Sequence, residues 1–183
     1  MVSFLGRLLG WQLEIPPEER ETTLAYLAQE LKLAAFQDLE AGRYNDAVTK
    51  YGGDVRPGGS QVSALLPAAR RLLKAADELV GRHSGFGPVP DAAAGAYFTW
   101  QRTYMQYQEW ASGIVSVYEG LEAGILPDAG RVQHLLAESE KTRKAAENEE
   151  GKLMRRLKLQ GEEWRVLMQG AQSAVKAERW EPA

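Results

Sequence analysis

The sequence predicts an all-α fold, a bundle of four to five helices. Its apolar residues recur at spacings of three and four, which is the period of a helix with one buried face. No segment alternates between apolar and polar residues as a half-buried strand does. Clusters of glycine and proline separate the periodic segments. With 183 residues, the chain is long enough for one domain with a stable core, which we place at residues 16–183.

The first half of this domain is predicted to contain three helices. The first follows Pro16-Pro17 and ends near Gly42, a short one spans about 44–51, and the third spans about 61–82. Four glycines and a proline in the stretch GGDVRPGG predict a loop before the third helix. If Ser63 caps that helix, Pro67 lies near its first turn at little cost, whereas a start at Ser60 predicts a kink.

The turn predicted at Gly42 carries a resemblance to a known repeat. The pattern Gly42-x-Tyr44-x-x-Ala47-x-x-x-Tyr51 is similar to the turn and second helix of a tetratricopeptide repeat. That resemblance implies a helix-turn-helix and peptide binding by stacked repeats. The pattern departs at Asp38, where the repeat has an aromatic residue, and no second copy follows. We therefore expect a generic tight helix-turn-helix at this position.

The next predicted helix, residues 91 to about 123, contains the aromatic stretch YFTWQRTYMQYQEW. Its stripe keeps the three-four spacing without interruption over Tyr97, Trp100, Tyr104, Tyr107, Ala111, Ile114, Tyr118 and Leu121. A nucleic-acid platform would need interleaved basic residues, but Arg102 is the stretch's only positive charge. We interpret the stripe as core and expect the buried tyrosine hydroxyls to have polar partners.

From about residue 128 to 180 the pattern predicts a long C-terminal helix that projects beyond the bundle. Two helices joined near Gly151 or Gly161 are the alternative. Residues 137–152 have only alanines as apolar residues and look solvated, and then the apolar stripe resumes at Leu153, Leu157, Trp164 and Leu167. One uninterrupted helix would be about 80 Å long. Since a small domain cannot cover that length, we predict that these four residues contact a partner.

Residues 1–15 predict a short amphipathic helix or arm outside the bundle. Phe4, Leu8 and Trp11 share one helical face, and Leu5 and Leu9 flank it. These five residues are candidate contacts for a protein partner or a second copy of the chain. The alternative is a membrane surface, because tryptophan and phenylalanine favour the lipid headgroup boundary. Little positive charge accompanies them, which favours the protein contact.

Composition and motifs exclude several chemistries. The chain has no cysteine, which removes disulfides, thiolate metal sites and cysteine nucleophiles. Its net charge of −3, with acidic residues close behind each basic cluster, argues against nucleic acid. The loop GDVRPGGS has Gly59 where a phosphate-binding loop needs lysine. His134 and Glu138 provide at most half a metal site. We therefore expect no cofactor and no metal.

The sequence accordingly predicts a non-catalytic structural or adaptor protein. It would self-associate, through coiled-coil-like helix contacts, or bind a protein partner. A peripheral membrane protein anchored by residues 1–15 is the first alternative, and an enzyme with a site between bundle helices is the second. No segment has the roughly 20 apolar residues of a membrane span, and the N-terminus lacks signal-peptide features, so we expect a cytoplasmic location, peripheral at a membrane in the first alternative.

Overall fold

The computed structural model describes residues 16–52, 56–82, 89–126, 130–159 and 161–177. Within these ranges the chain is helical and contains no strand. The helices are α2 (Pro17–Tyr51), α3 (Ser60–Arg82), α4 (Asp91–Glu122), α5 (Arg131–Arg156) and α6 (Gly161–Ala177). The predicted all-α class is confirmed.

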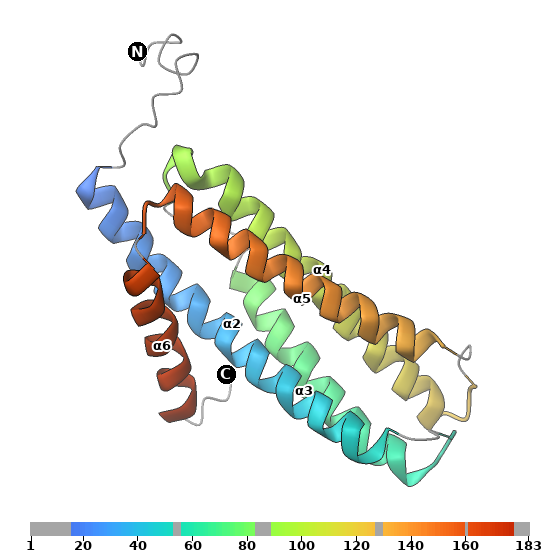
Figure 1. Cartoon of the computed structure of the whole chain (residues 1–183). Coiled ribbons are helices and arrows are strands. Elements are labelled where there is room, and N and C mark those ends of the chain that lie inside the picture. The colour runs from blue at the N-terminus through green and yellow to red at the C-terminus, as the bar shows by residue number, and fades with distance from the viewer. Residues whose placement is uncertain (1–15, 53–55, 83–88, 127–129, 160, 178–183) are drawn as a thin grey trace.

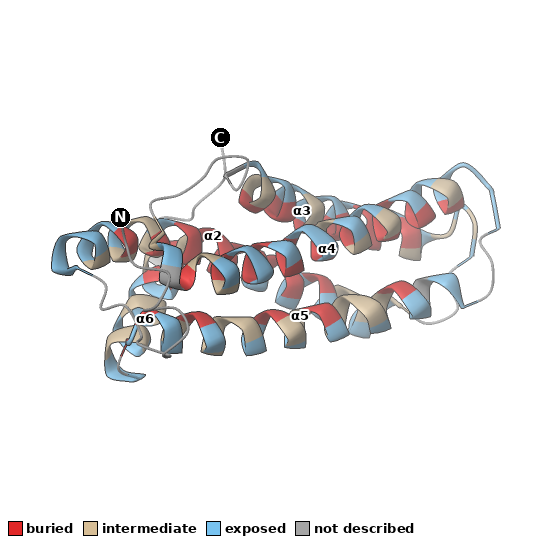
Figure 2. Cartoon of the chain, turned by 90° about the horizontal axis from the view of Figure 1, so that it is seen from above, coloured by how far each residue is buried: buried red, intermediate tan, exposed pale blue. Residues whose placement is uncertain are grey.

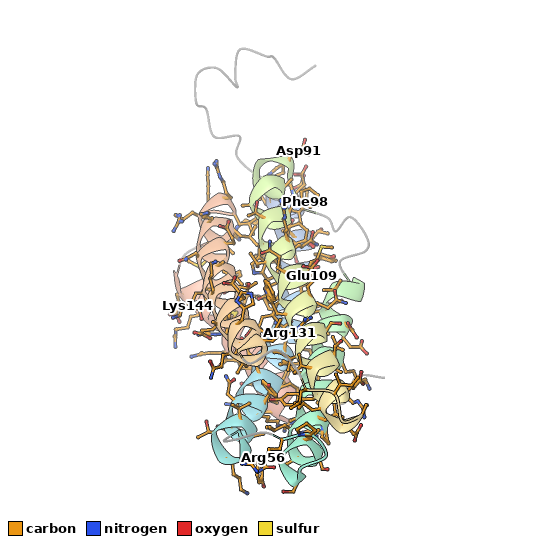
Figure 3. All side chains as sticks on the ribbon, turned by 90° about the vertical axis from the view of Figure 1, so that its right-hand side faces the viewer. Arg56, Asp91, Phe98, Glu109, Arg131 and Lys144 are labelled. Atoms are coloured by element: carbon orange, nitrogen blue, oxygen red, sulfur yellow. The ribbon has the colours of Figure 1, made fainter. Side chains whose placement is uncertain are left out.

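Helices α2 to α5 run alternately up and down and form an antiparallel bundle (Figure 1). Each packs against its successor in the chain, and α4 and α5 share the most extensive contact. Helix α6 lies beside the N-terminal half of α2 (Figure 1). Asp91, at the start of α4, marks one end of the bundle and Arg56, before α3, marks the other (Figure 3). Short connections explain this up-and-down order, because they join neighbours in space.

Helix α2 continues through Gly42, so the predicted turn and the separate helix at 44–51 are wrong. A glycine inside a helix costs only about 1 kcal/mol relative to alanine. The residues around it, Ala41 and Tyr44, are both buried in the bundle, and their packing outweighs that cost. The helix-turn-helix implied by the tetratricopeptide resemblance is therefore absent, and α2 ends at Tyr51, where Gly52 donates its N–H to the Val48 carbonyl.

Helix α3 begins at Ser60 rather than near Ser63, so Pro67 lies inside it. Pro67 is on the exposed side, where the missing N–H leaves water free to reach the unpaired carbonyl. The kink predicted for this start stays a prediction.

Helix α4 matches its predicted bounds and ends in a glycine-dependent cap. Gly124 adopts a left-handed conformation with φ 82°, and Ile125 donates its N–H to the Gly120 carbonyl at 2.8 Å. Gly124 donates to the Leu121 carbonyl at 3.1 Å. This pair of bonds is the Schellman motif, which satisfies the last carbonyls of a helix.

The aromatic stripe of α4 is core, as the sequence predicts. All eight of its members are at most 7% exposed, and Trp100 is completely covered. In Figure 2 the buried positions of α2, α3 and α4 face the interior of the bundle. The stripe joins two apolar clusters. One surrounds Tyr97 and Trp100 and includes residues of α5 and α6, and the other surrounds Tyr118 and lies mainly between α2, α3 and α4.

Three buried tyrosines of the stripe, Tyr97, Tyr104 and Tyr118, have the polar partners that the sequence analysis requires. Tyr97 donates its hydroxyl hydrogen to the buried carboxylate of Glu30 at 2.7 Å, and Gln101 donates to the Tyr97 hydroxyl at 2.6 Å. The hydroxyls of Tyr44 and Tyr118 lie 3.0 Å apart. These bonds join α2 to α4 in both clusters, so the polar atoms of the stripe hold the two helices in register.

The C-terminal segment forms two helices joined next to Gly161, which confirms the alternative that the sequence left open, and the single long projecting helix is wrong. Helix α5 ends at Arg156, and Lys158 follows in a left-handed conformation with φ 51°. Leu159 donates its N–H to the Met154 carbonyl at 3.0 Å, which again forms a Schellman motif. Leu159 is buried, so the chain turns where an apolar side chain anchors it to the core.

The turn brings α6 back onto the bundle. Arg20 on α2 forms an ion pair with Glu163 on α6 at 2.7 Å. Leu153 and Leu157 are at most 1% exposed, and Trp164 and Leu167 are partly buried against the same cluster. Leu153 and Leu157 are therefore covered by their own chain rather than free to contact a partner. For Trp164 and Leu167, which are only partly buried, the partner contact stays a prediction.

Across the described ranges, we find no helix with the length and apolar character that membrane crossing requires.

Candidate functional site

Two cavities lie between α2, α4 and α5. The first, of about 230 Å³, is lined from four helices by residues that include Asp38 on α2, Tyr104 on α4, Glu150 on α5 and Gln172 on α6. We call it the acidic cavity. The second, of about 220 Å³, lies between α2, α3, α4 and α5. Tyr107 and Arg143 line both cavities, so the two are adjacent parts of one groove.

Helical spacing explains how the acidic cavity gathers its polar groups. Arg143, Glu147 and Glu150 follow each other at intervals of four and three on α5, which places them on one face. Tyr104 and Tyr107 are three residues apart on the facing side of α4. Thr142 and Ala146 are buried on α5, so this segment has one face toward α4 and a charged face toward water.

The carboxyl of Glu150 is the group whose titration is changed most clearly by the cavity. Loss of hydration raises its pKa from 4.5 to about 7, and the negative charges of Asp38 and Glu147 add to that rise. The hydroxyl of Tyr104 donates to Glu150 at 3.2 Å and opposes the rise. Near neutral pH, Glu150 therefore exchanges protons readily.

The carboxyl of Asp38 also has a raised pKa, although part of this residue is exposed to water. Protein atoms surround its carboxyl at the cavity wall, and this loss of hydration raises its pKa from 3.8 to about 6. The nearby guanidinium of Arg143 opposes the shift and the carboxylate of Glu147 adds to it. The exposed side of Asp38 faces water while the remainder is enclosed, as expected for a group at the mouth of a cavity.

Arg143 is held by two carboxylates of its own helix. Its Nε and Nη2 atoms each donate to Glu140 at 2.9 Å, and Nη1 donates to Glu147. The bond to Glu140 raises the pKa of Arg143 further above its already high value. The positive charge is thus already matched by two negative charges, and the other carboxylates of the cavity gain little compensation from it.

The tyrosines of the cavity stay protonated. Burial raises the pKa of Tyr104, and the adjacent charge of Glu150 raises it further. Burial likewise raises the pKa of Tyr107, followed by the effect of Asp38. Both hydroxyls are therefore neutral hydrogen-bonding groups at neutral pH.

Two other buried carboxylates serve the fold. Glu30 accepts the bond from Tyr97 in the first apolar cluster. Glu40 is 2% exposed and pairs with Arg43 on its own helix and with Arg71 on α3, at 3.4 Å in the second case. These partners lie within the protein, so we assign neither residue to a binding site.

The candidate residues predicted at the N-terminus, Phe4, Leu5, Leu8, Leu9 and Trp11, lie outside the described residues. Asp38, Glu147 and Glu150, in contrast, were not predicted as site residues. Asp38 stood out only as the departure from the tetratricopeptide pattern, and the other two belong to a segment interpreted as solvated on most sides. Only the packing of α5 on α4 shows that they share a cavity.

Within the described ranges, no three histidine or acidic side chains are placed to hold a metal ion. His134 instead meets the ring of Trp110 edge to face, with ring centroids 6.2 Å apart. In the described part of the loop GDVRPGGS, Gly58 donates its N–H to the Leu121 carbonyl at the end of α4. Its amide is therefore engaged in a structural contact.

A comparison with known protein families finds no model that matches this chain, and a comparison with solved structures finds no match.

Proposed function

We propose that the protein is a non-catalytic adaptor that binds a segment of a protein partner in the groove between α2 and α5. The observation that carries the proposal is the pair of adjacent cavities along this groove, which are open at the surface and share Tyr107 and Arg143. A rigid bundle whose helices enclose a groove is a common way to bind an elongated segment.

The character of the two cavities supports an elongated protein ligand. The acidic cavity is lined by charged and polar groups, whereas Val48, Leu72, Ile114 and Leu136 line the second cavity with apolar surface. A single chain segment with one polar and one apolar side chain would match both. Each cavity, at about 220 to 230 Å³, has the volume of about seven water molecules at about 30 Å³ each, which is enough for a side chain.

The proposal is tested by selecting displayed random peptides on the full chain and measuring their affinities by fluorescence anisotropy. We expect enriched peptides to bind the parent protein with roughly micromolar Kd. They should bind the Gln172→Trp variant about tenfold or more weakly, because the variant places a bulky ring at the cavity wall. Gln172 is exposed on α6, so this change leaves the core intact.

Gln169→Trp is the matched control, since Gln169 is also exposed on α6 and does not line the cavity. The proposal fails if no peptide is enriched over a surface without protein. It also fails if both tryptophan variants reduce affinity equally.

A second candidate is an enzyme with its site in the acidic cavity. The observation that favours it is that Asp38 and Glu150 have pKa values raised to about 6 and about 7, the range in which a carboxyl can serve as a general acid near neutral pH. Hydrolysis of chromogenic ester, glycoside or phosphate substrates that disappears in Glu150→Gln would support it. Equal rates in both proteins would exclude Glu150 from any such reaction.

A further inference from the structure

Three hydrogen-bond donors that line the acidic cavity, on Tyr104, Thr103 and Arg143, are engaged within the chain. Tyr104 donates to Glu150, and the Thr103 hydroxyl donates to the Trp100 carbonyl at 2.6 Å. Arg143 donates to Glu140 and Glu147 on its own helix. A ligand acceptor placed against these three groups would have to displace bonds that the protein makes for itself.

The acceptors of the cavity are in excess. Gln37 is 3% exposed, and its buried Oε1 atom receives no hydrogen bond from the residues that the structure describes. Asp38 lines the same cavity and is exposed, so water reaches its carboxyl, which accepts no side-chain hydrogen bond from the described residues. A buried acceptor without a donor is uncommon in native proteins, because its lost hydration is not replaced. The ligand that completes this cavity is a hydrogen-bond donor.

The charge of the cavity favours a hydrogen-bond donor that is also positively charged. Asp38 on α2 and Glu147 and Glu150 on α5 line it, and Arg143 is the one positively charged residue among its lining residues. Arg143 donates two hydrogen bonds to Glu140, and the charge of Glu140 further offsets the positive charge of Arg143 at the cavity. The groups contributed by α4 and α6 are neutral, namely Thr103, Tyr104, Tyr107, Met168 and Gln172. A positive ligand is attracted here and a negative ligand is repelled.

The walls of the cavity also include apolar surface against which the methylene chain of a cationic side chain can pack. Ala146 and Met168 lie among the lining residues, and the ring of Tyr107 continues toward the second cavity. Lysine and arginine carry their charge on a chain of methylene groups that packs on apolar surface. The side chain of either residue combines the donor, the charge and the stem that this cavity lacks.

We propose that the acidic cavity binds a lysine or arginine side chain of the partner segment, while an apolar side chain of the same segment enters the second cavity. This inference rests on the proposed function, and it names the chemistry by which the groove selects its partner. Gln37, Asp38 and Glu150 receive the cationic group, and Tyr107 contacts the chain between the two side chains.

The test uses the full chain labelled with nitrogen-15 and three probes: acetyl-leucyl-lysine amide, acetyl-leucyl-norleucine amide and n-butylamine. Norleucine has the stem of lysine without its charge. We expect the lysine probe to shift the amide signals of residues around Gln37 and Ala146, and to bind at least about tenfold more tightly than the norleucine probe. Asp38→Asn and Glu150→Gln should each weaken the lysine probe by a factor of about ten.

Asp46→Asn is the matched control, because Asp46 is exposed on the same helix as Asp38 and lines neither cavity. Equal affinity for the lysine and norleucine probes, with both blocked by Gln172→Trp, would overturn the cation proposal and leave the peptide-binding function standing. Equal affinity for n-butylamine and the lysine probe would assign the cavity to a free amine and overturn the peptide part. If no probe shifted any amide signal at roughly 10 mM, the inference would be overturned. The peptide selection would then still test the proposed function by itself.

Discussion

At the scale of single residues, burial changes what a side chain does more than its sequence neighbours suggest. Glu149 and Glu150 are adjacent, but Glu149 pairs with Lys152 on its own helix, whereas Glu150 accepts a bond from Tyr104 in the acidic cavity. The pKa of Glu150 is raised to about 7, because its carboxyl loses most of its hydration at the cavity. The two residues look alike in the sequence and differ by their position on the helix.

The raised pKa of Glu150 makes a prediction about stability and pH. The folded protein binds this proton more tightly than the unfolded chain, so the free energy of unfolding should fall as pH rises from the ordinary value of 4.5 through about 7. The contribution of Glu150 to this fall is about 1 to 3 kcal/mol, and Asp38 acts in the same direction. Urea unfolding followed by circular dichroism at pH values of about 5 and about 8 measures it.

In Glu150→Gln the free energy of unfolding should depend less on pH, and at the higher pH this variant should be more stable than the parent. Glu149→Gln is the control, because Glu149 pairs with Lys152 and does not line the acidic cavity. A Glu150→Gln variant with the pH dependence of the parent protein would contradict the prediction.

At the scale of helices, the ends follow from local backbone chemistry that is only partly visible in the sequence. Helices α4 and α5 both end in a Schellman motif, but the left-handed residue is Gly124 in the first and Lys158 in the second. Glycine adopts this conformation without strain, whereas a residue with a Cβ atom pays about 1 kcal/mol for it. The break after α5 is therefore set by burial of Leu159 rather than by a glycine.

This difference predicts opposite effects at the two caps. Lys158→Gly should stabilise the protein by about 0.5 to 1 kcal/mol, since it relieves the left-handed strain. Gly124→Ala should destabilise it by about 1 kcal/mol. A Cβ atom at Gly124 would meet no atom within 4 Å, so only the backbone would contribute to that loss. Thermal unfolding of both variants is the measurement, and a lower melting temperature for Lys158→Gly would contradict the assignment of the motif.

At the scale of the whole molecule, the return of α6 removes one reason to expect self-association. The sequence predicted a long helix that needed another chain to cover it, but Leu153 and Leu157 are buried in an apolar cluster formed by helices of the same chain. Residues 1–15 then remain as the predicted segment for self-association or for a membrane. They lie outside the described residues, so both proposals rest on their amphipathic sequence.

A double variant of the full chain, Leu8→Asp with Trp11→Asp, separates these proposals. If residues 1–15 join two copies, light scattering should show the molar mass of the parent falling to that of one chain, 20.3 kDa, in the variant. Co-sedimentation with anionic liposomes should be low for both proteins. Met105→Asp, at an exposed apolar position on α4, is the control. Loss of liposome binding without a change in mass would favour the membrane proposal instead.

The sequence alone determined the helical class, the bounds of α4 and the burial of its aromatic stripe. Each depends on a repeating pattern within one segment, and a helix of period 3.6 turns such a pattern into a face. Tertiary structure decided whether α2 passes through Gly42, where the chain turns after Leu157, and which acidic residues meet. Asp38 and Glu150 are far apart in the sequence and on different helices, so their meeting follows from packing between helices, for which no local pattern encodes the register.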